Sequence, residues 1–310
     1  MNPTGARTYE IENHSLVATV VGLLPSYDSE FSLIGDILNN SDKKRISFYE
    51  DQVGVWEASM LQRTRLGLTF DIDWVPDWCI KLCVDLVRNA NYRATIFITH
   101  ESDILADLRK LDSIELGIHP NLLPGSTHGD GVEDVLNYCL SLVPEARVMR
   151  THALVQSSRL FKTICDEYPQ IETDFSLFLP FHYNLAPTIC YFGNNGNFLT
   201  RIPYNWSDDQ ILWRPVWDWT AAPSVDSGFN VFAFHPIHVA LNSANLDNHT
   251  SIMQLLDGRP LLSLRREEVE PFVNHGAGVR TFLESLLTDC DATQSETASQ
   301  LSRAFNGNVK

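Results

Sequence analysis

The stretch LGLTFDIDW, residues 66–74, decides how the chain is interpreted, because it reads as an apolar strand that ends in two carboxylates. These carboxylates belong to Asp71 and Asp73, with Ile72 between them. A polar strand end that runs into a loop would explain them, since Asp is common where strands give way to turns. A catalytic site is the more specific explanation, and the rest of the sequence is needed to decide between the two.

Composition limits the class of protein. The 310 residues are 44% hydrophobic, which is enough for one large domain or two small ones. No run of about 18 apolar residues is present, so no membrane span is predicted. The formal net charge of −16 argues against nucleic acid and anionic membrane surfaces as partners, because both attract Lys and Arg.

Two further features predict the compartment. The N-terminus lacks a basic segment followed by an apolar one, so no signal peptide is expected. None of the six cysteines forms a CxxC pair, and Cys79 and Cys83 share one face of an expected helix, which favours burial as small apolar side chains. These features predict a cytoplasmic protein with reduced thiols.

From residue 64 the chain alternates expected strands with expected helices, which is typical of βαβ units and a parallel sheet. Four or more such units in a row allow either an open doubly wound sheet or a barrel. The expected strands are 65–73, 92–100, 114–120, 146–152 and 171–177, and the helices between them are 77–90, 102–111, 131–143 and 157–168.

The pattern changes after about residue 178. The segment 178–222 is rich in aromatic residues, Pro and Asn, and long functional loops with short strands are expected there. A last clear strand is expected at 229–239 and a last helix at 276–289.

The domain organisation predicted from these patterns has three segments. Residues 1–62 are expected to form an N-terminal extension packed on the main domain. Residues 63–290 form the α/β domain itself, and 291–310 form a polar tail that is expected to be mobile.

Unusual polar residues follow several of the expected strands. In parallel α/β architectures the carboxyl ends of the strands line one common mouth, where active sites lie. Residues from five strands are therefore expected to converge on one site, which favours the catalytic explanation of the opening stretch. They are Asp71, Asp73, His119, Arg150, His152, Asp174 and His235.

The Asp-x-Asp spacing predicts a division of labour. In an extended strand, residues i and i+2 point to the same face with Cα atoms about 6.5–7 Å apart, so Ile72 would point into the packing layer. One carboxylate can then hold a cation while the other accepts a proton from water. Two His and one Asp form a frequent catalytic zinc shell, with Asp73 and His119 as expected ligands and His152 or His235 as the third.

The ordered set LTFDID, RATIFIT, ELGIHP, MRTH and FAFHP, over about residues 64–240, resembles the polysaccharide deacetylase (NodB homology) superfamily of carbohydrate esterases. The resemblance implies a distorted (β/α)7 barrel and a hydrolase of the deacetylase type that acts on carbon–nitrogen bonds other than peptide bonds. It also implies a divalent metal ion, zinc before others, and a carbohydrate substrate.

The resemblance also assigns roles near the metal. Asp71 matches the family's general base, while Asp73 and His119 match its metal ligands. The family's second ligand His is replaced by Leu123, which cannot bind a metal. His152 stands where the family has Pro, so an exchange of one imidazole for another favours His152 as the third ligand.

The resemblance also implies which residues orient the general base and which act as the general acid. Arg150 would orient the base, and His235 would be the general acid, held and tuned by Asp174. The segment RIPYNWSDD (201–209) resembles a segment of some family members, so Trp206 and Asp209 are expected to line the substrate pocket.

The function predicted from the sequence is a metal-dependent hydrolase that removes an acetyl group from an N-acetylated sugar of a glycan or glycan precursor. Two alternatives remain open. One is a non-catalytic carbohydrate-binding relic of the fold, because Leu123 removes an expected ligand. The other is a hydrolase of another amide or an ester. The sequence predicts nothing about the oligomeric state.

Overall fold

The computed structural model describes residues 63–180, 182, 185–214 and 216–306. The predicted N-terminal extension, residues 1–62, lies outside the described residues. The strands are β1 Thr64–Asp71, β2 Ala94–Ile98, β3 Ile114–Ile118, β4 Val148–Met149, β5 Thr173–Asp174, β6 Thr188–Cys190, β7 Leu199–Arg201, β8 Trp206–Ser207 and β9 Gly228–Phe234. The α-helices are α3 Asp77–Asn89, α4 Leu105–Leu108, α5 Val132–Leu142, α6 Ser158–Glu167, α7 Asp208–Leu212, α8 Pro236–Leu241, α9 Asp247–Leu256, α10 Arg266–Val269, α11 Val279–Asp289 and α12 Ala298–Asn306.

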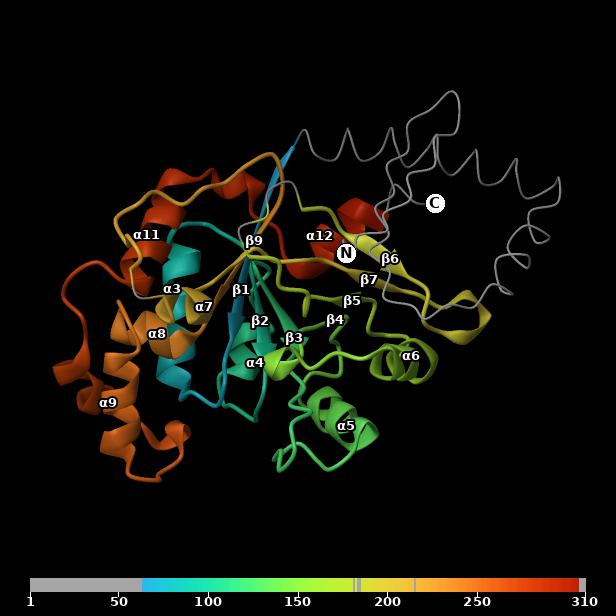
Figure 1. Cartoon of the computed structure of the whole chain (residues 1–310), viewed down its shortest axis with the longest axis horizontal. Coiled ribbons are helices and arrows are strands. Elements are labelled where there is room, and N and C mark those ends of the chain that lie inside the picture. Colours follow the sequence, from blue (N-terminus) through green and yellow to red (C-terminus); the bar gives the residue numbers. More distant parts are fainter. Residues whose placement is uncertain (1–62, 181, 183–184, 215, 307–310) are drawn as a thin grey trace, which may run out of the picture. The chain divides into compact units, whose positions relative to one another are not determined.

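The strands form a single curled sheet in the order β6-β7-β5-β4-β3-β2-β1-β9-β8 (Figure 1). Every strand pair is parallel except β6 with β7. This is the parallel α/β sheet that the alternation of strands and helices predicted, and all its strands except β6 direct their carboxyl ends to one side.

One extended segment, residues 199–207, joins the two ends of the curled sheet. Its start, β7, pairs with β5, and its end, β8, pairs with β9. Between them, the backbone N–H groups of Ile202 and Tyr204 donate hydrogen bonds to carbonyls of β5 and of the segment that follows it. The sheet is thereby a distorted barrel, as the family resemblance implied.

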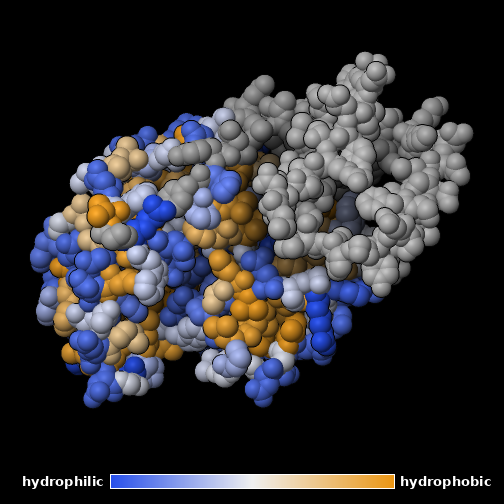
Figure 2. Space-filling model, viewed as in Figure 1, coloured by the Kyte–Doolittle hydropathy of each residue, from blue (hydrophilic) through white to orange (hydrophobic). Residues whose placement is uncertain are grey.

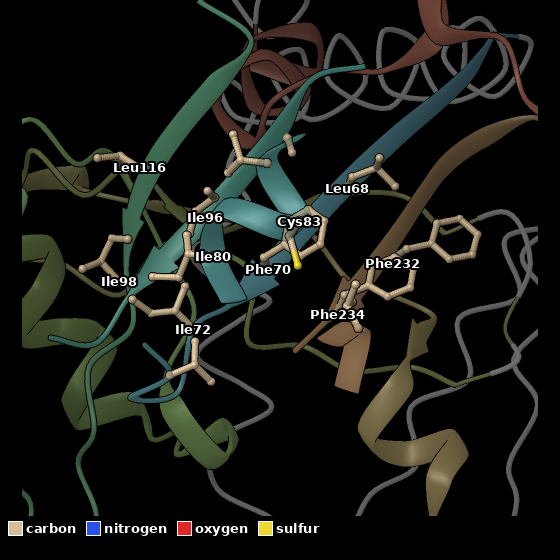
Figure 3. Close-up of a cluster of buried hydrophobic side chains, with 14 of the residues drawn as sticks. Leu68, Phe70, Ile72, Ile80, Cys83, Ile96, Ile98, Leu116, Phe232 and Phe234 are labelled. Atoms are coloured by element: carbon tan, nitrogen blue, oxygen red, sulfur yellow. The ribbon is translucent and has the colours of Figure 1, made fainter. Parts of the chain in front are cut away.

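Strand β1 separates two layers of apolar side chains. Leu66, Leu68 and Phe70 alternate along it and pack in a large buried cluster with helices α3, α8 and α11, part of which Figure 3 shows. The alternate positions point into the barrel, where Phe97 and Val231 belong to a second buried cluster. Because side chains alternate along a strand, Asp71 lies on the inner side, at the mouth.

The structure corrects the ends of several expected elements. Strands β4 and β5 each have two residues, because beyond them the ladder continues only by single bonds, such as Arg150 N to Ile118 O at 3.1 Å. The strand expected at 229–239 ends at Phe234, since Pro236 begins α8, and Pro is favoured in the first turn of a helix.

The expected polar, mobile tail is also corrected, because residues 298–306 form helix α12, which is packed against the barrel. Leu301 and Ala298 are buried in the inner cluster. A Cβ on Gly67 would lie 2.8 Å from Leu301 Cδ1, so the glycine allows this close approach. None of the described helices is both long and apolar enough to cross a membrane.

Candidate active site

Asp71 is held in place by a buried arginine. Arg150 Nη1 donates a hydrogen bond of 2.9 Å to Asp71 Oδ1, and Arg150 Nε donates to the Phe175 carbonyl at 3.2 Å. The guanidinium lies between two rings, 4.7 Å from the centre of Phe97 and 4.4 Å from that of Tyr204. These contacts fix the direction of the Asp71 carboxylate, as expected for Arg150 from the sequence.

Asp73 reaches the same mouth by a different route from the one predicted. Strand β1 ends at Asp71, and Asp73 and Trp74 adopt left-handed backbone conformations with φ of 35° and 56°. The extended spacing of the two acids is therefore wrong, although Ile72 is buried as expected. A left-handed conformation is costly for residues other than Gly and is found preferentially at functional sites.

His119 and His152 follow β3 and β4 and meet at Asp73. Asp73 Oδ1 lies 3.2 Å from His119 Nε2 and 3.2 Å from His152 Nδ1. The two imidazole nitrogens are 3.4 Å apart. Ligand atoms around a tetrahedral zinc ion, bound at 2.0–2.1 Å, lie about 3.3 Å apart. The three atoms thus have the separations that one small cation requires.

Backbone contacts set the positions of both histidines. His119 N donates to Ile98 O at 2.9 Å, and His152 N donates to Pro120 O at 3.0 Å, which connects the two ligand-bearing loops. His152 begins a short 3-10 helix, η1 (His152–Leu154), in which Ala153 and Leu154 have positive φ angles of 52° and 54°. Strained backbone thus flanks two of the three candidate ligands.

Leu123, at the position of the missing family ligand, does not belong to this group. Its side chain is 41% exposed and lines a groove of about 470 Å³ together with Pro124, Val132 and Leu160. Figure 2 shows hydrophobic surface in the lower middle of the face, where Figure 1 places the segment between β4 and α6. His152, and not Leu123, lies with Asp73 and His119 in the group of close ligand atoms.

The electrostatics of the group follow from its contacts. Burial alone would raise the pKa of Asp73, but hydrogen bonds from His119 and His152 hold it well below its usual range. Burial would lower the pKa of His152, but Asp73 raises it above the ordinary histidine value. These shifts describe an ionised carboxylate paired with imidazoles, and a cation held there would take the place of the imidazole protons.

His235, expected as the general acid, lies at the end of β9 and is held by an acid that the sequence analysis did not select. His235 Nδ1 is 2.7 Å from Asp208 Oδ1, and its backbone N–H donates to Asp208 Oδ2 at 2.7 Å. His235 Nε2 points to the mouth, 3.6 Å from Asp73 Oδ2. Burial would lower the pKa of His235, but the buried Asp208 raises it well above its usual range.

The predicted partner of His235, Asp174, is elsewhere. It accepts a hydrogen bond from Arg201 Nε at 2.8 Å and another from Ser176 N at 3.1 Å, so its role as the tuning acid is wrong. Asp208 stands directly before the chosen Asp209 in the sequence. Its burial at the start of α7 could not be predicted, because the aromatic-rich segment around it has no clear hydrophobic periodicity.

The two expected pocket residues differ in their surroundings. Trp206 is a core residue, 7% exposed, with its ring 4.7 Å from that of Phe282 and 4.9 Å from that of Phe234. The Asp209 side chain is 47% exposed, and its Oδ1 lies 3.6 Å from His238 Nε2.

Comparison with known proteins agrees with this geometry. The family model of WbmS-like polysaccharide deacetylases matches residues 68–253. The chain belongs to this family. The crystal structure of WbmS from Bordetella bronchiseptica, described as a candidate polysaccharide deacetylase involved in O-antigen biosynthesis, matches with a TM-score of 0.64 and 31% identity, over 74% of this chain and 91% of that one. Among proteins with curated functions, none matches the sequence significantly.

Membership of the WbmS-like family confirms the resemblance seen in the sequence, and it supports a deacetylase that acts on a glycan. The match to the WbmS structure has 31% identity over 74% of this chain. Asp71, Asp73, His119, His152 and His235 all lie within the matched residues 68–253.

Proposed function

We propose that this WbmS-like chain is a metal-dependent hydrolase that removes an acetyl group from an N-acetylated sugar of a glycan or glycan precursor. The observation that carries the proposal is the group of Asp73, His119 and His152, whose ligand atoms lie 3.2–3.4 Å apart. Polysaccharide deacetylase family membership supports the same reaction class.

Asp73, His119 and His152 would hold the metal ion. Two imidazole nitrogens and one carboxylate oxygen suit zinc, which takes such ligands in catalytic sites and keeps a position open for water. A divalent ion held there supplies Lewis-acid activation of the attacking water and of the acetyl carbonyl.

Asp71 is the proposed general base. Its Oδ2 lies 4.0 Å from His119 Nε2, so it borders the candidate metal position without belonging to the closest group. Arg150 holds its Oδ1, which leaves the other oxygen free to accept a proton from the attacking water. A base positioned in this way contributes about 10²–10⁴-fold to the rate.

His235 is the proposed general acid. Asp208 fixes the Nδ1 side of the ring and raises the pKa of His235, which favours the protonated form that the acid needs. The Nε2 proton then faces the mouth, where it can be transferred to the leaving amine. The products are acetate and a free amino sugar.

Metal analysis and acetate release test the proposal together. We expect the protein, purified without chelator and supplied with zinc, to bind stoichiometric metal and to release acetate from at least one member of a panel. The panel holds methyl glycosides and nucleotide conjugates of N-acetylglucosamine and N-acetylgalactosamine. Activity should disappear with a chelator and return with zinc.

Two outcomes would favour the alternatives. Substoichiometric metal under zinc-replete conditions, with sugar binding unchanged in His119→Ala, would favour a non-catalytic carbohydrate-binding protein. Acetate release from O-acetyl esters but from no N-acetyl sugar would favour an esterase on the same scaffold.

A further inference from the structure

Helix α7 (Asp208–Leu212) presents a carboxylate and an indole on one face. Asp209 lies in its first turn, and Trp213, at its carboxyl end, keeps a helical backbone with φ of −74°. Residues i and i+4 of a helix lie on the same face with Cβ atoms about 5–6 Å apart. Both side chains reach the surface, because Asp209 is 47% exposed and Trp213 72% exposed.

A buried histidine supports the Asp209 carboxylate. His238 Nε2 lies 3.6 Å from Asp209 Oδ1, while its Nδ1 is 3.2 Å from Ser243 Oγ on the opposite side of the ring. Burial would raise the pKa of Asp209, but contact with His238 lowers it to about 2. The exposed oxygen atoms of Asp209 are therefore ionised at neutral pH and available as hydrogen-bond acceptors.

Helix α7 lies next to the proposed general acid. Asp208, the residue before Asp209, holds the proposed general acid His235, and α7 lies beside α8 (Figure 1). Asp209 is close enough to His235 to raise its pKa. A sugar whose amine receives the proton of His235 would thus have its ring next to α7.

We propose that Asp209 and Trp213 form a subsite for the neutral sugar ring that carries the leaving amine, with the ring's C–H face on the indole of Trp213 and two neighbouring hydroxyl groups donating to Asp209. The proposal rests on the proposed function and names the substrate class of the same site. An exposed indole offers a flat apolar surface with little conformational entropy to lose, and a carboxylate can accept two hydroxyl protons at once.

The negative charge of Asp209 is expected to make the subsite discriminate between neutral and acidic sugars. A uronate in the same place would bring a second carboxylate next to an ionised one, and like charges at close range repel. The subsite is therefore expected to select neutral amino sugars over their uronate counterparts.

Steady-state kinetics with the methyl glycoside of N-acetylglucosamine test the subsite in the full-length, zinc-loaded protein. Trp213→Ala and Asp209→Asn should each raise KM about tenfold, the loss expected from one hydrogen bond to a charged group or one aromatic contact. Trp213 does not touch the reacting atoms, so kcat of Trp213→Ala should stay within about twofold of the unchanged protein. In Asp209→Asn, kcat is expected to fall as well, because Asp209 raises the pKa of His235. An unchanged KM in both variants, or a fall in kcat alone, would overturn the subsite.

The chain offers matched controls at the opposite end of the barrel. Tyr191 is an aromatic side chain of similar exposure, 66%, at the end of β6, and Asp112 is an exposed carboxylate just before β3. Tyr191→Ala and Asp112→Asn should leave KM unchanged. If the controls raise KM as much as the α7 variants do, the subsite assignment is wrong.

Charge selectivity separates Asp209 from a merely structural residue. The unchanged protein should use the neutral glycoside at least about tenfold better than its uronate counterpart, and Asp209→Asn should lose most of that preference. Equal use of the two glycosides by the unchanged protein would overturn the role of Asp209.

A binding measurement tests the subsite separately from the proposed reaction. In the Asp71→Asn background, saturation-transfer NMR with the same glycoside should show binding that weakens about tenfold on adding Trp213→Ala. Such binding without acetate release in the unchanged protein would sink the proposed function and keep the subsite. Acetate release with a KM that neither Trp213→Ala nor Asp209→Asn changes would keep the proposed function and contradict the subsite.

Discussion

Arg150 Nη1 lies 2.9 Å from Asp71 Oδ1, and both residues are buried at the inner wall of the mouth. Breaking a buried ion pair by removing one partner typically costs about 3–5 kcal/mol, because it leaves an uncompensated charge. We therefore expect Arg150→Met to lower the free energy of unfolding by about that amount, measured by urea denaturation. Adding Asp71→Asn should recover at least about 1 kcal/mol, the coupling expected for a direct contact. Strictly additive effects would contradict the pairing.

Asp71→Asn tests the division of labour between the two acids of the opening stretch. The variant should lose about 10²–10⁴-fold in kcat, as expected for a general base, and retain its zinc because Asp71 lies outside the closest ligand group. Asp73→Asn is the matched change two residues along and should lose zinc. Full activity in Asp71→Asn would show that another group acts as the base.

The third metal ligand could come from position 152, where this chain has His, or from position 123, where the family has a ligand His and this chain has Leu. His152→Ala should weaken zinc binding at least about 100-fold, measured by competition with a chelator, because it removes a direct ligand. Adding Leu123→His should not restore binding, since Leu123 lies on the wall of the groove and outside the group of three. Recovery of zinc affinity in the double variant would show that the family's usual ligand position remains within reach.

Asp208 and Asp174 are the two candidates for the acid that serves His235. Asp208→Asn should lower kcat about 10- to 100-fold with zinc retained, because it removes the 2.7 Å contact that orients the imidazole and favours its protonated form. Asp174→Asn should instead lower the unfolding free energy through the loss of its contact with Arg201, with kcat little changed. A larger kcat effect from Asp174→Asn would restore the assignment made from the sequence.

The sequence predicted the parallel α/β sheet and the residues at its mouth because both leave a signal in the sequence alone. The sheet is visible in the hydrophobic periodicity, and the mouth in the polar residues that follow the strands. Asp71, Asp73, His119, His152 and His235 were all found in this way. Asp208 was missed because it belongs to a segment without a clear period. The left-handed turn at Asp73 was missed because no Gly marks it. Helix α12 was missed because its buried face consists of Ala298, Leu301 and two serines, which carry little hydrophobic signal.

Glu115 tests whether α12 belongs to the folded barrel. Its carboxylate accepts a hydrogen bond of 2.8 Å from Ser299 N and another from the Ser299 hydroxyl, while Thr95 Oγ1 accepts one of 2.8 Å from Ala298 N. These bonds satisfy N–H groups that the first turn of a helix leaves without intrahelical partners. We expect Glu115→Ala to lower the free energy of unfolding by about 1–2 kcal/mol, as the loss of a helix cap does.

Hydrogen exchange locates that loss. The amides of α12 should exchange faster in Glu115→Ala, while the amides of β1 and β9 keep their protection, because the cap acts only on the helix that closes the amino end of the barrel. Glu145, an exposed carboxylate paired with Arg109, provides the control, and Glu145→Ala should leave α12 unchanged. Equal exchange of α12 in both variants would show that Leu301 and its apolar contacts hold the helix without the cap.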